Sequence, residues 1–115
     1  MTKLKFTLPF PPSSNRYWRN FRGRMVKSAE ARAYHQQISL LLRNITQFTG
    51  EVVIALDFYR PKKQGDLDNR IKICLDALNG IAFEDDKQVA EIYARRFEDK
   101  LNPRVEVTVY NRYCL

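Results

Sequence analysis

Hydrophobic and polar residues alternate in three stretches of the chain, as they do in a β-strand that buries one face. These stretches are residues 4–10, 52–59 and 105–110. A less regular apolar stretch at 89–97 also predicts a strand. The turn expected at 98–103 separates it from the strand at 105–110. The pattern therefore predicts four strands.

Two further stretches carry apolar residues at helical spacing. Ser28 is a favourable N-cap for a first helix over residues 29–44, and Gly80 suits the end of a second helix that starts at Asp68 or Asn69. The second helix is expected to bury Ile71, Cys74, Leu75 and Leu78. The resulting order, β-α-β-α-β-β, predicts an α+β fold: a two-layer sandwich in which two helices cover one face of a mixed four-stranded sheet.

Residues 11–27 carry neither pattern and are expected to form an irregular loop rich in positive charge. Five cations follow one another there without an acid, and three aromatic residues lie between them. Cations suit phosphates and aromatic faces suit unpaired bases, so this loop is typical of a protein that binds branched or single-stranded nucleic acid. With a second basic step just before the acidic segment, the candidate DNA-binding residues are Arg16, Tyr17, Arg19, Arg22, Arg24, Lys27, Lys62 and Lys63.

Composition narrows the class of protein. A chain of 115 residues with 44% hydrophobic residues predicts a single domain over residues 1–115. No apolar run approaches the roughly 18 residues of a membrane span, and Lys3 and Lys5 interrupt the start, so we expect a cytoplasmic protein without a signal peptide. Two cysteines and the single His35 form neither a disulfide framework nor a zinc site, so any metal site must use oxygen ligands. The net charge of +7 favours a polyanionic partner.

Acidic residues nevertheless concentrate at two junctions of this basic chain. Asp66 and Asp68 precede the second helix, and in an extended segment both carboxylates would point to the same side. Lys72 lies one helical turn after Asp68, and Asp76 one turn further. The second junction, Asp85 and Asp86, lies just before the third strand of the sequence.

Such a set of carboxylates with one ammonium suits a Mg²⁺ site for cleaving a phosphodiester, because Mg²⁺ prefers a few carboxylate ligands and keeps positions for water and phosphate. Structural alternatives remain open: Asp68 as an N-cap or the partner of Lys72, and Asp85 and Asp86 as turn residues. A calcium-binding EF-hand loop is excluded. Such a loop needs glycine at its sixth position and glutamate at its twelfth, and a loop starting at Asp66 would have Ile71 and Ala77 there.

Several segments, in order, resemble the RusA-type Holliday junction resolvases. They are LPFPPSSNRYWR at 8–19, GR at 23–24, SAEARAY at 28–34, DLDNRIK at 66–72, LDAL at 75–78 and DDKQV at 85–89. The resemblance implies a homodimer that nicks a four-way DNA junction symmetrically with Mg²⁺ or Mn²⁺. It also implies metal ligation by Asp66, Asp68 and Asp86 and catalysis by these residues with Lys72. Asp85 and Asp76 are second-tier candidates for the same site. Gln64 and Gly65 depart from a family that often has a basic residue before the first aspartate, which leaves the phosphate contacts open.

A DNA-binding module and a nucleotide-dependent transferase are the two alternatives to a resolvase. A non-catalytic DNA-binding module of the same fold would gain affinity by losing its acids near phosphates, so the acids argue against it. A transferase that holds a nucleotide diphosphate through D-x-D would need a nucleotide-binding domain and a glycine-rich loop, and the sequence contains no such loop.

Overall fold

A computed structural model of the chain describes residues 3–62 and 67–113. The predicted site residues Lys63 and Asp66 lie outside the described residues, as does Cys114. The main sheet has four strands in the order β1-β6-β4-β5. Their bounds are Lys3–Pro9 for β1, Val52–Arg60 for β4, Val89–Glu98 for β5 and Arg104–Asn111 for β6.

The sheet is mixed, because β4 pairs with β5 in parallel while β6 pairs antiparallel with both β1 and β4. β4 alternates as its sequence predicts: Val52, Ile54, Leu56 and Phe58 are buried, whereas Ala55, Asp57 and Tyr59 are only partly covered. Parallel neighbours need a crossover connection, and a helix supplies it between β4 and β5.

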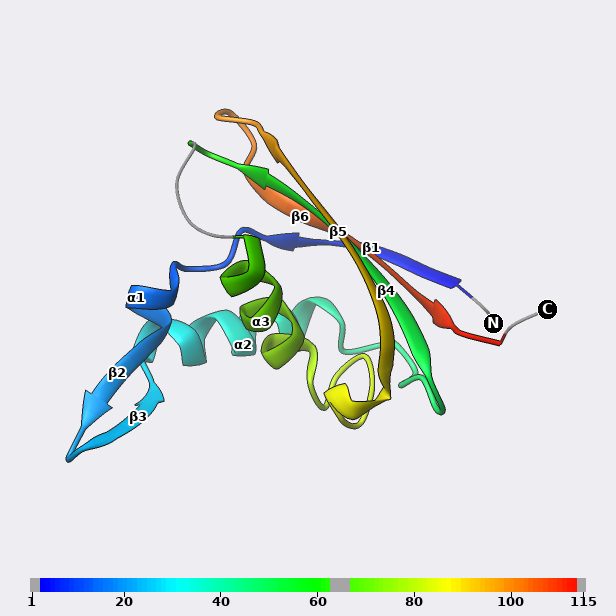
Figure 1. Cartoon of the computed structure of the whole chain (residues 1–115), viewed down its shortest axis with the longest axis horizontal. Coiled ribbons are helices and arrows are strands. Elements are labelled where there is room, and N and C mark those ends of the chain that lie inside the picture. Colours follow the sequence, from blue (N-terminus) through cyan, green and yellow to red (C-terminus); the bar gives the residue numbers. More distant parts are fainter. Residues whose placement is uncertain (1–2, 63–66, 114–115) are drawn as a thin grey trace.

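Two helices, α2 (Ala29–Leu41) and α3 (Leu67–Leu78), cover one face of the sheet (Figure 1). The core forms between the layers, where Ile38 of α2 and Ile73 of α3 are buried with the inward residues of β4 and β6. The α+β sandwich with a mixed four-stranded sheet is thus confirmed. No helix among the described residues is both long and apolar enough to cross a membrane.

Capping residues set the helix ends largely as predicted. The Ser28 hydroxyl accepts a hydrogen bond from the Ala31 N–H at 3.0 Å, and Gly80 follows α3 with φ +82°. The predicted buried stripe of α3 was partly wrong, because Ile73 and Ala77 are buried while Ile71 and Leu75 are only partly so. Each residue turns a helix by about 100°, so packing against both the sheet and α2 decides which residues face inward.

Residues 11–27 were wrongly predicted to be irregular. They contain a short helix α1 (Ser14–Tyr17) and a hairpin of β2 (Trp18–Phe21) and β3 (Arg24–Lys27). The hairpin turn has only two residues, Arg22 and Gly23, with φ +52° and +77°, and positive φ at both positions is the turn that matches the twist of paired strands. The element order is therefore β-α-β-β-α-β-α-β-β, and the hairpin projects from the body of the molecule (Figure 1).

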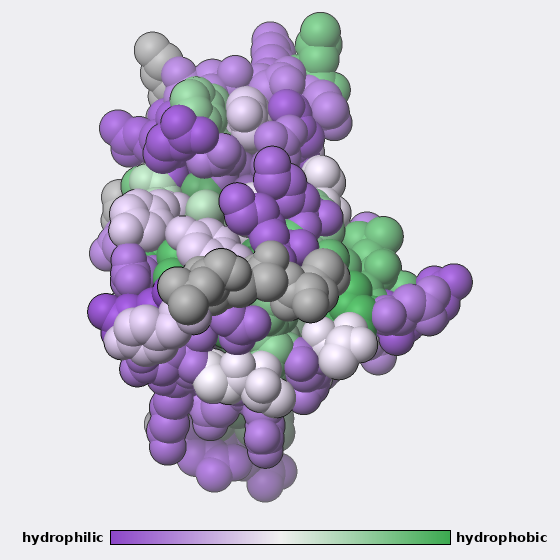
Figure 2. Space-filling view, turned by 90° about the vertical axis from the view of Figure 1, so that its right-hand side faces the viewer, coloured by the Kyte–Doolittle hydropathy of each residue, from purple (hydrophilic) through white to green (hydrophobic). Residues whose placement is uncertain are grey.

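The face of the main sheet that carries no helix presents mostly hydrophilic side chains. Its outward positions include the ion pair of Asp57 with Arg95 and that of Glu106 with Arg104. Seen from the right-hand side of Figure 1, most of the visible surface is hydrophilic (Figure 2). This alternation of outward polar and inward apolar residues explains why the sheet is covered on one face only.

Candidate functional site

The first acidic junction lies where the chain passes from β4 into α3. Asp68 is in the first turn of α3 with an exposed side chain, and its carboxylate accepts a hydrogen bond from the Asn69 N–H at 3.0 Å. An acid at this end of a helix is favoured by the helix dipole. Lys72 is also exposed, and no ion pair within the described part of the chain joins it to Asp68. Both side chains are therefore available to a ligand.

The second acidic junction is a short 3₁₀ helix, η1 (Asp86–Gln88), in front of β5. Asp85 is its N-cap: its carboxylate accepts from the Lys87 N–H at 3.0 Å, while the Gln88 amide oxygen accepts from the Asp85 N–H at 3.2 Å. This reciprocal pair is a capping box. The structural alternative thus accounts for Asp85, whereas Asp86 holds no cap and is exposed.

The pKa values of the neighbouring Asp85 and Asp86 are shifted in opposite directions. The backbone hydrogen bond from Lys87 lowers the pKa of Asp85 below its usual value, with help from Asp86. Although Asp86 is exposed, some loss of hydration at its carboxylate raises its pKa, and the carboxylates of Asp85 and Asp76 raise it further. Asp86 is therefore the acid that a bound cation would most relieve of repulsion.

The structure separates the two acidic junctions within one chain. Because β4 and β5 are parallel, the end of β4 and the start of β5 lie at opposite ends of the sheet, and α3 runs back between them (Figure 1). Asp86 interacts with Asp76, which follows Asp68 by eight residues, or about 12 Å along a helix. Within a single chain, the two acidic junctions therefore lie toward opposite ends of α3. Accordingly, no three acidic, histidine or cysteine side chains among residues 3–62 and 67–113 are grouped closely enough to hold a metal.

Asp76 connects α3 to the base of the β2–β3 hairpin. It accepts a hydrogen bond from the Tyr17 hydroxyl and pairs with Lys27 Nζ at 2.9 Å. Tyr17 is fully buried, and burial together with its bond to Asp76 raises its pKa. In this arrangement Tyr17 has no surface to offer DNA, in contrast to its expected role, and instead fixes the hairpin to α3.

Replacing Tyr17 by phenylalanine should lower the free energy of unfolding by about 1–2 kcal/mol, because Asp76 loses a hydrogen bond from a buried hydroxyl. Urea unfolding followed by circular dichroism measures the change. Tyr113→Phe is the matched control, since Tyr113 is 76% exposed and should change stability by less than about 0.5 kcal/mol. Equal effects of the two substitutions would show that the Tyr17–Asp76 bond contributes nothing.

The hairpin presents the cations and aromatic groups that the sequence indicates. Trp18 is 37% exposed and Phe21 44% exposed. The guanidinium groups of Arg19 and Arg22 lie 5.5 and 5.3 Å from the centre of the Phe21 ring. Arg24 is exposed on the facing strand. An aromatic ring between cations on a projecting hairpin can stack on a base while its neighbours contact phosphates.

Sequence reasoning missed Arg70, which lies between Asp68 and Lys72. Its guanidinium donates to the Pro11 carbonyl at 3.0 Å and lies 4.6 Å from the centre of the Phe10 ring. These contacts join α3 to the segment after β1, which no spacing rule could foresee. The sequence feature that could have indicated Arg70 is its position inside the acidic segment 66–72.

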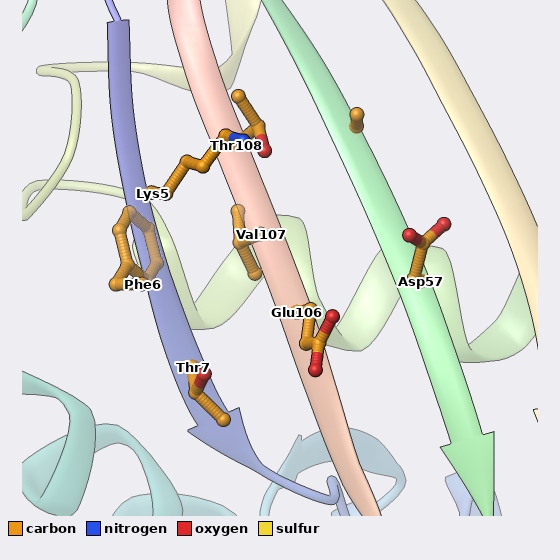
Figure 3. Close-up of a pocket in the computed structure, with 8 residues that line it drawn as sticks. Lys5, Phe6, Thr7, Asp57, Glu106, Val107 and Thr108 are labelled. Carbon is orange, nitrogen blue, oxygen red and sulfur yellow. The ribbon is translucent and has the colours of Figure 1, made fainter.

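The open face of the main sheet has a hollow of about 360 Å³ that contains none of the predicted site residues. Figure 3 shows it with the helices behind the strands, and Lys5, Asp57, Glu106 and Thr108 are among its lining residues. Both of its carboxylates are already in ion pairs with arginines. Neither of these carboxylates is therefore free to bind a cation without losing its arginine partner. Cys74 is not a catalytic centre, because complete burial raises the pKa of its thiol to about 12 and keeps it protonated.

A family model and the sequences of similar proteins all indicate the same family for this chain. The family model described as endodeoxyribonuclease RusA matches residues 9–110. The chain is 35% identical over 114 residues to the crossover junction endodeoxyribonuclease RusA of Escherichia coli K12, and the match covers 95% of each chain. The protein of the same name from Enterobacteria phage 82 is 34% identical over the same share, which fits an occurrence in phages and prophages. The chain therefore belongs to the RusA family of endodeoxyribonucleases.

Proposed function

We propose that this endodeoxyribonuclease resolves Holliday junctions in the cytoplasm by paired symmetrical nicks, in DNA recombination and repair. The observation that carries the proposal is the combination of a projecting basic hairpin with exposed acids on α3 and at η1. The printed function of its relatives, crossover junction cleavage, gives the substrate class.

Mg²⁺ is the proposed cofactor, and Mn²⁺ is an alternative of similar coordination chemistry. The donor set fits such an ion, because Asp68 and Asp86 are exposed carboxylates, and Mg²⁺ prefers oxygen ligands of this kind. With Asp66 they would hold the ion. A bound divalent ion lowers the pKa of a water and stabilises negative charge on the scissile phosphate.

The protein side chains have distinct tasks in this proposal. Lys72, one turn beyond Asp68 on the exposed face of α3, supplies a positive charge next to the phosphate during cleavage. Asp85 supports Asp86 by holding the start of η1 in place through its cap hydrogen bonds. The hairpin and the basic step at Lys62 contact the DNA backbone.

A homodimer explains how the separated acids could form one site. Within one chain α3 separates Asp68 from the η1 junction, so a second copy related by a twofold axis, with its α3 antiparallel to the first, would bring its Asp86 to the Asp66–Asp68 end. The twofold symmetry of a dimer then produces two equivalent sites. Two sites related by symmetry match the two strands that must be cut in a four-way junction.

The proposal is tested by incubating the purified protein with a four-way junction, a linear duplex and a flapped duplex, each with Mg²⁺ or with EDTA. Symmetric nicks confined to the junction and dependent on Mg²⁺ are expected. Tight junction binding without cleavage under Mg²⁺ or Mn²⁺ would instead identify a catalytically inactive DNA-binding module. Failure to bind any of the three DNAs would contradict both functions.

A further inference from the structure

A second cavity, of about 410 Å³, gathers three cations from distant parts of the sequence. Arg16 comes from α1, Lys62 follows β4, and Arg70 belongs to α3. We call this cavity the Arg70 pocket. Its wall also contains Phe10 and Pro11, and one carboxylate, that of Glu30. Three cations against one acid leave an excess of positive charge, which favours an anionic ligand.

Contacts within the protein hold Arg70 in place without using all its donors. One nitrogen donates to the Pro11 carbonyl, and the guanidinium lies 4.6 Å from the centre of the Phe10 ring. A guanidinium has five N–H donors in a fixed fork that matches a phosphate, and among residues 3–62 and 67–113 only the Pro11 carbonyl accepts from Arg70, so several donors remain for a ligand.

The position of the pocket suits a ligand next to the cleavage site. Arg70 lies in the same turn of α3 as Asp68 and Lys72, but two residues from each and so on a different side of the helix, and Lys62 lies just before the segment that leads to Asp66. A phosphate in the pocket would therefore be a neighbour of the phosphate that is cut. We propose that the Arg70 pocket binds a backbone phosphate of the DNA close to the phosphate that is cut. The pocket would then supply the positive charge that the sequence lacks at Gly65. This inference rests on the proposed DNA substrate.

Single-site variants test the proposal through junction binding in Ca²⁺ or EDTA, which separates binding from cleavage. Arg70→Gln should weaken junction affinity roughly tenfold at moderate salt and reduce the slope of log affinity against log salt by about one. Lys62→Gln should act in the same direction, and because Lys62 is exposed it tests the pocket even if the Arg70 variant folds poorly. Thermal unfolding of each variant monitors folding.

Arg43→Gln is the matched control. Arg43 also donates to a backbone carbonyl at 3.0 Å, that of Leu40, but it follows α2 at the end away from the pocket residue Glu30. The variant removes the same charge and should leave affinity and salt slope close to those of the wild type. If Arg43→Gln reduced both as much as Arg70→Gln, only net charge would matter and the pocket proposal would be overturned.

A chemical cycle identifies the ligand. Junctions carrying one neutral methylphosphonate in place of a phosphate are bound to the wild type and to the Arg70→Gln protein. At one position near the cut, the modification should weaken wild-type binding but have little further effect on the variant. Additive effects at every position would overturn the proposal. So would inorganic phosphate binding to the pocket without such coupling, since the pocket would then hold a free anion.

Failure of this inference differs from failure of the proposed function. If the wild type bound no junction, the function itself would be wrong. If it bound and cleaved junctions while the Arg70→Gln protein, folded as shown by thermal unfolding, retained full affinity and salt slope, the pocket assignment would be wrong and the proposed function would stand.

Discussion

Asp68→Asn should reduce the rate of junction cleavage by on the order of a hundredfold or more, while junction binding is preserved or tightened. The substitution removes a proposed metal ligand and a negative charge near the DNA, yet it keeps the side-chain volume. The exposed position of Asp68 in the first turn of α3 limits the cost in stability, because asparagine can still accept the hydrogen bond from the Asn69 N–H.

Single-turnover cleavage of a labelled four-way junction, together with a binding titration without metal, measures both effects. Asp57→Asn is the matched control, since Asp57 lies on the open face of the sheet and pairs with Arg95. It should cleave at a rate close to that of the wild type. Near wild-type cleavage by Asp68→Asn would rule out Asp68 as an essential ligand.

A mixture of two inactive proteins should recover activity if one metal site is shared between two chains. The two proteins carry Asp68→Asn and Asp86→Asn. In a single chain Asp68 is in the first turn of α3, whereas Asp86 belongs to η1, beyond the other end of that helix. In a heterodimer with shared sites, one site collects both substitutions and the other has none. After random exchange of subunits, roughly a quarter of all sites are then intact, and single nicks are expected in place of paired nicks.

The outcome discriminates between two site architectures. If each site were built within one chain, every site in the mixture would carry a substitution, and activity would stay at the level of the separate proteins. Wild type mixed with the double variant Asp68→Asn/Asp86→Asn is the control, because it shows that subunits exchange.

Asp85→Asn alone should remain active, since asparagine is also a good N-cap and the role of Asp85 is to cap η1.

The strands and helix ends were predictable because they depend on local patterns. Alternation identifies β4, where Val52, Ile54, Leu56 and Phe58 all face the core. Ser28 and Gly80 mark helix ends through their own hydrogen bonding and backbone freedom. The hairpin at residues 18–27 was missed although Arg22 and Gly23 form a two-residue turn, because its strands do not alternate.

The chemistry of the candidate site was also largely readable from the sequence, but its geometry was not. The order of the acidic motifs identified the family, and the family model match bears this out. What no local rule could provide is the parallel pairing of β4 with β5, which separates Asp86 from Asp68 by the length of α3. Residue type and spacing along a chain do not fix which strands become neighbours.

By itself, then, the sequence determined the α+β class, the family and the residue types suited to a metal and to phosphates, because these follow from periodicity, motif order and charge. The tertiary structure decided how the residues are used. It buried Tyr17 against Asp76, made Asp85 a cap, and placed Arg16, Lys62 and Arg70 around one cavity. Those contacts join segments far apart in the chain, and only packing of the whole core determines which segments meet.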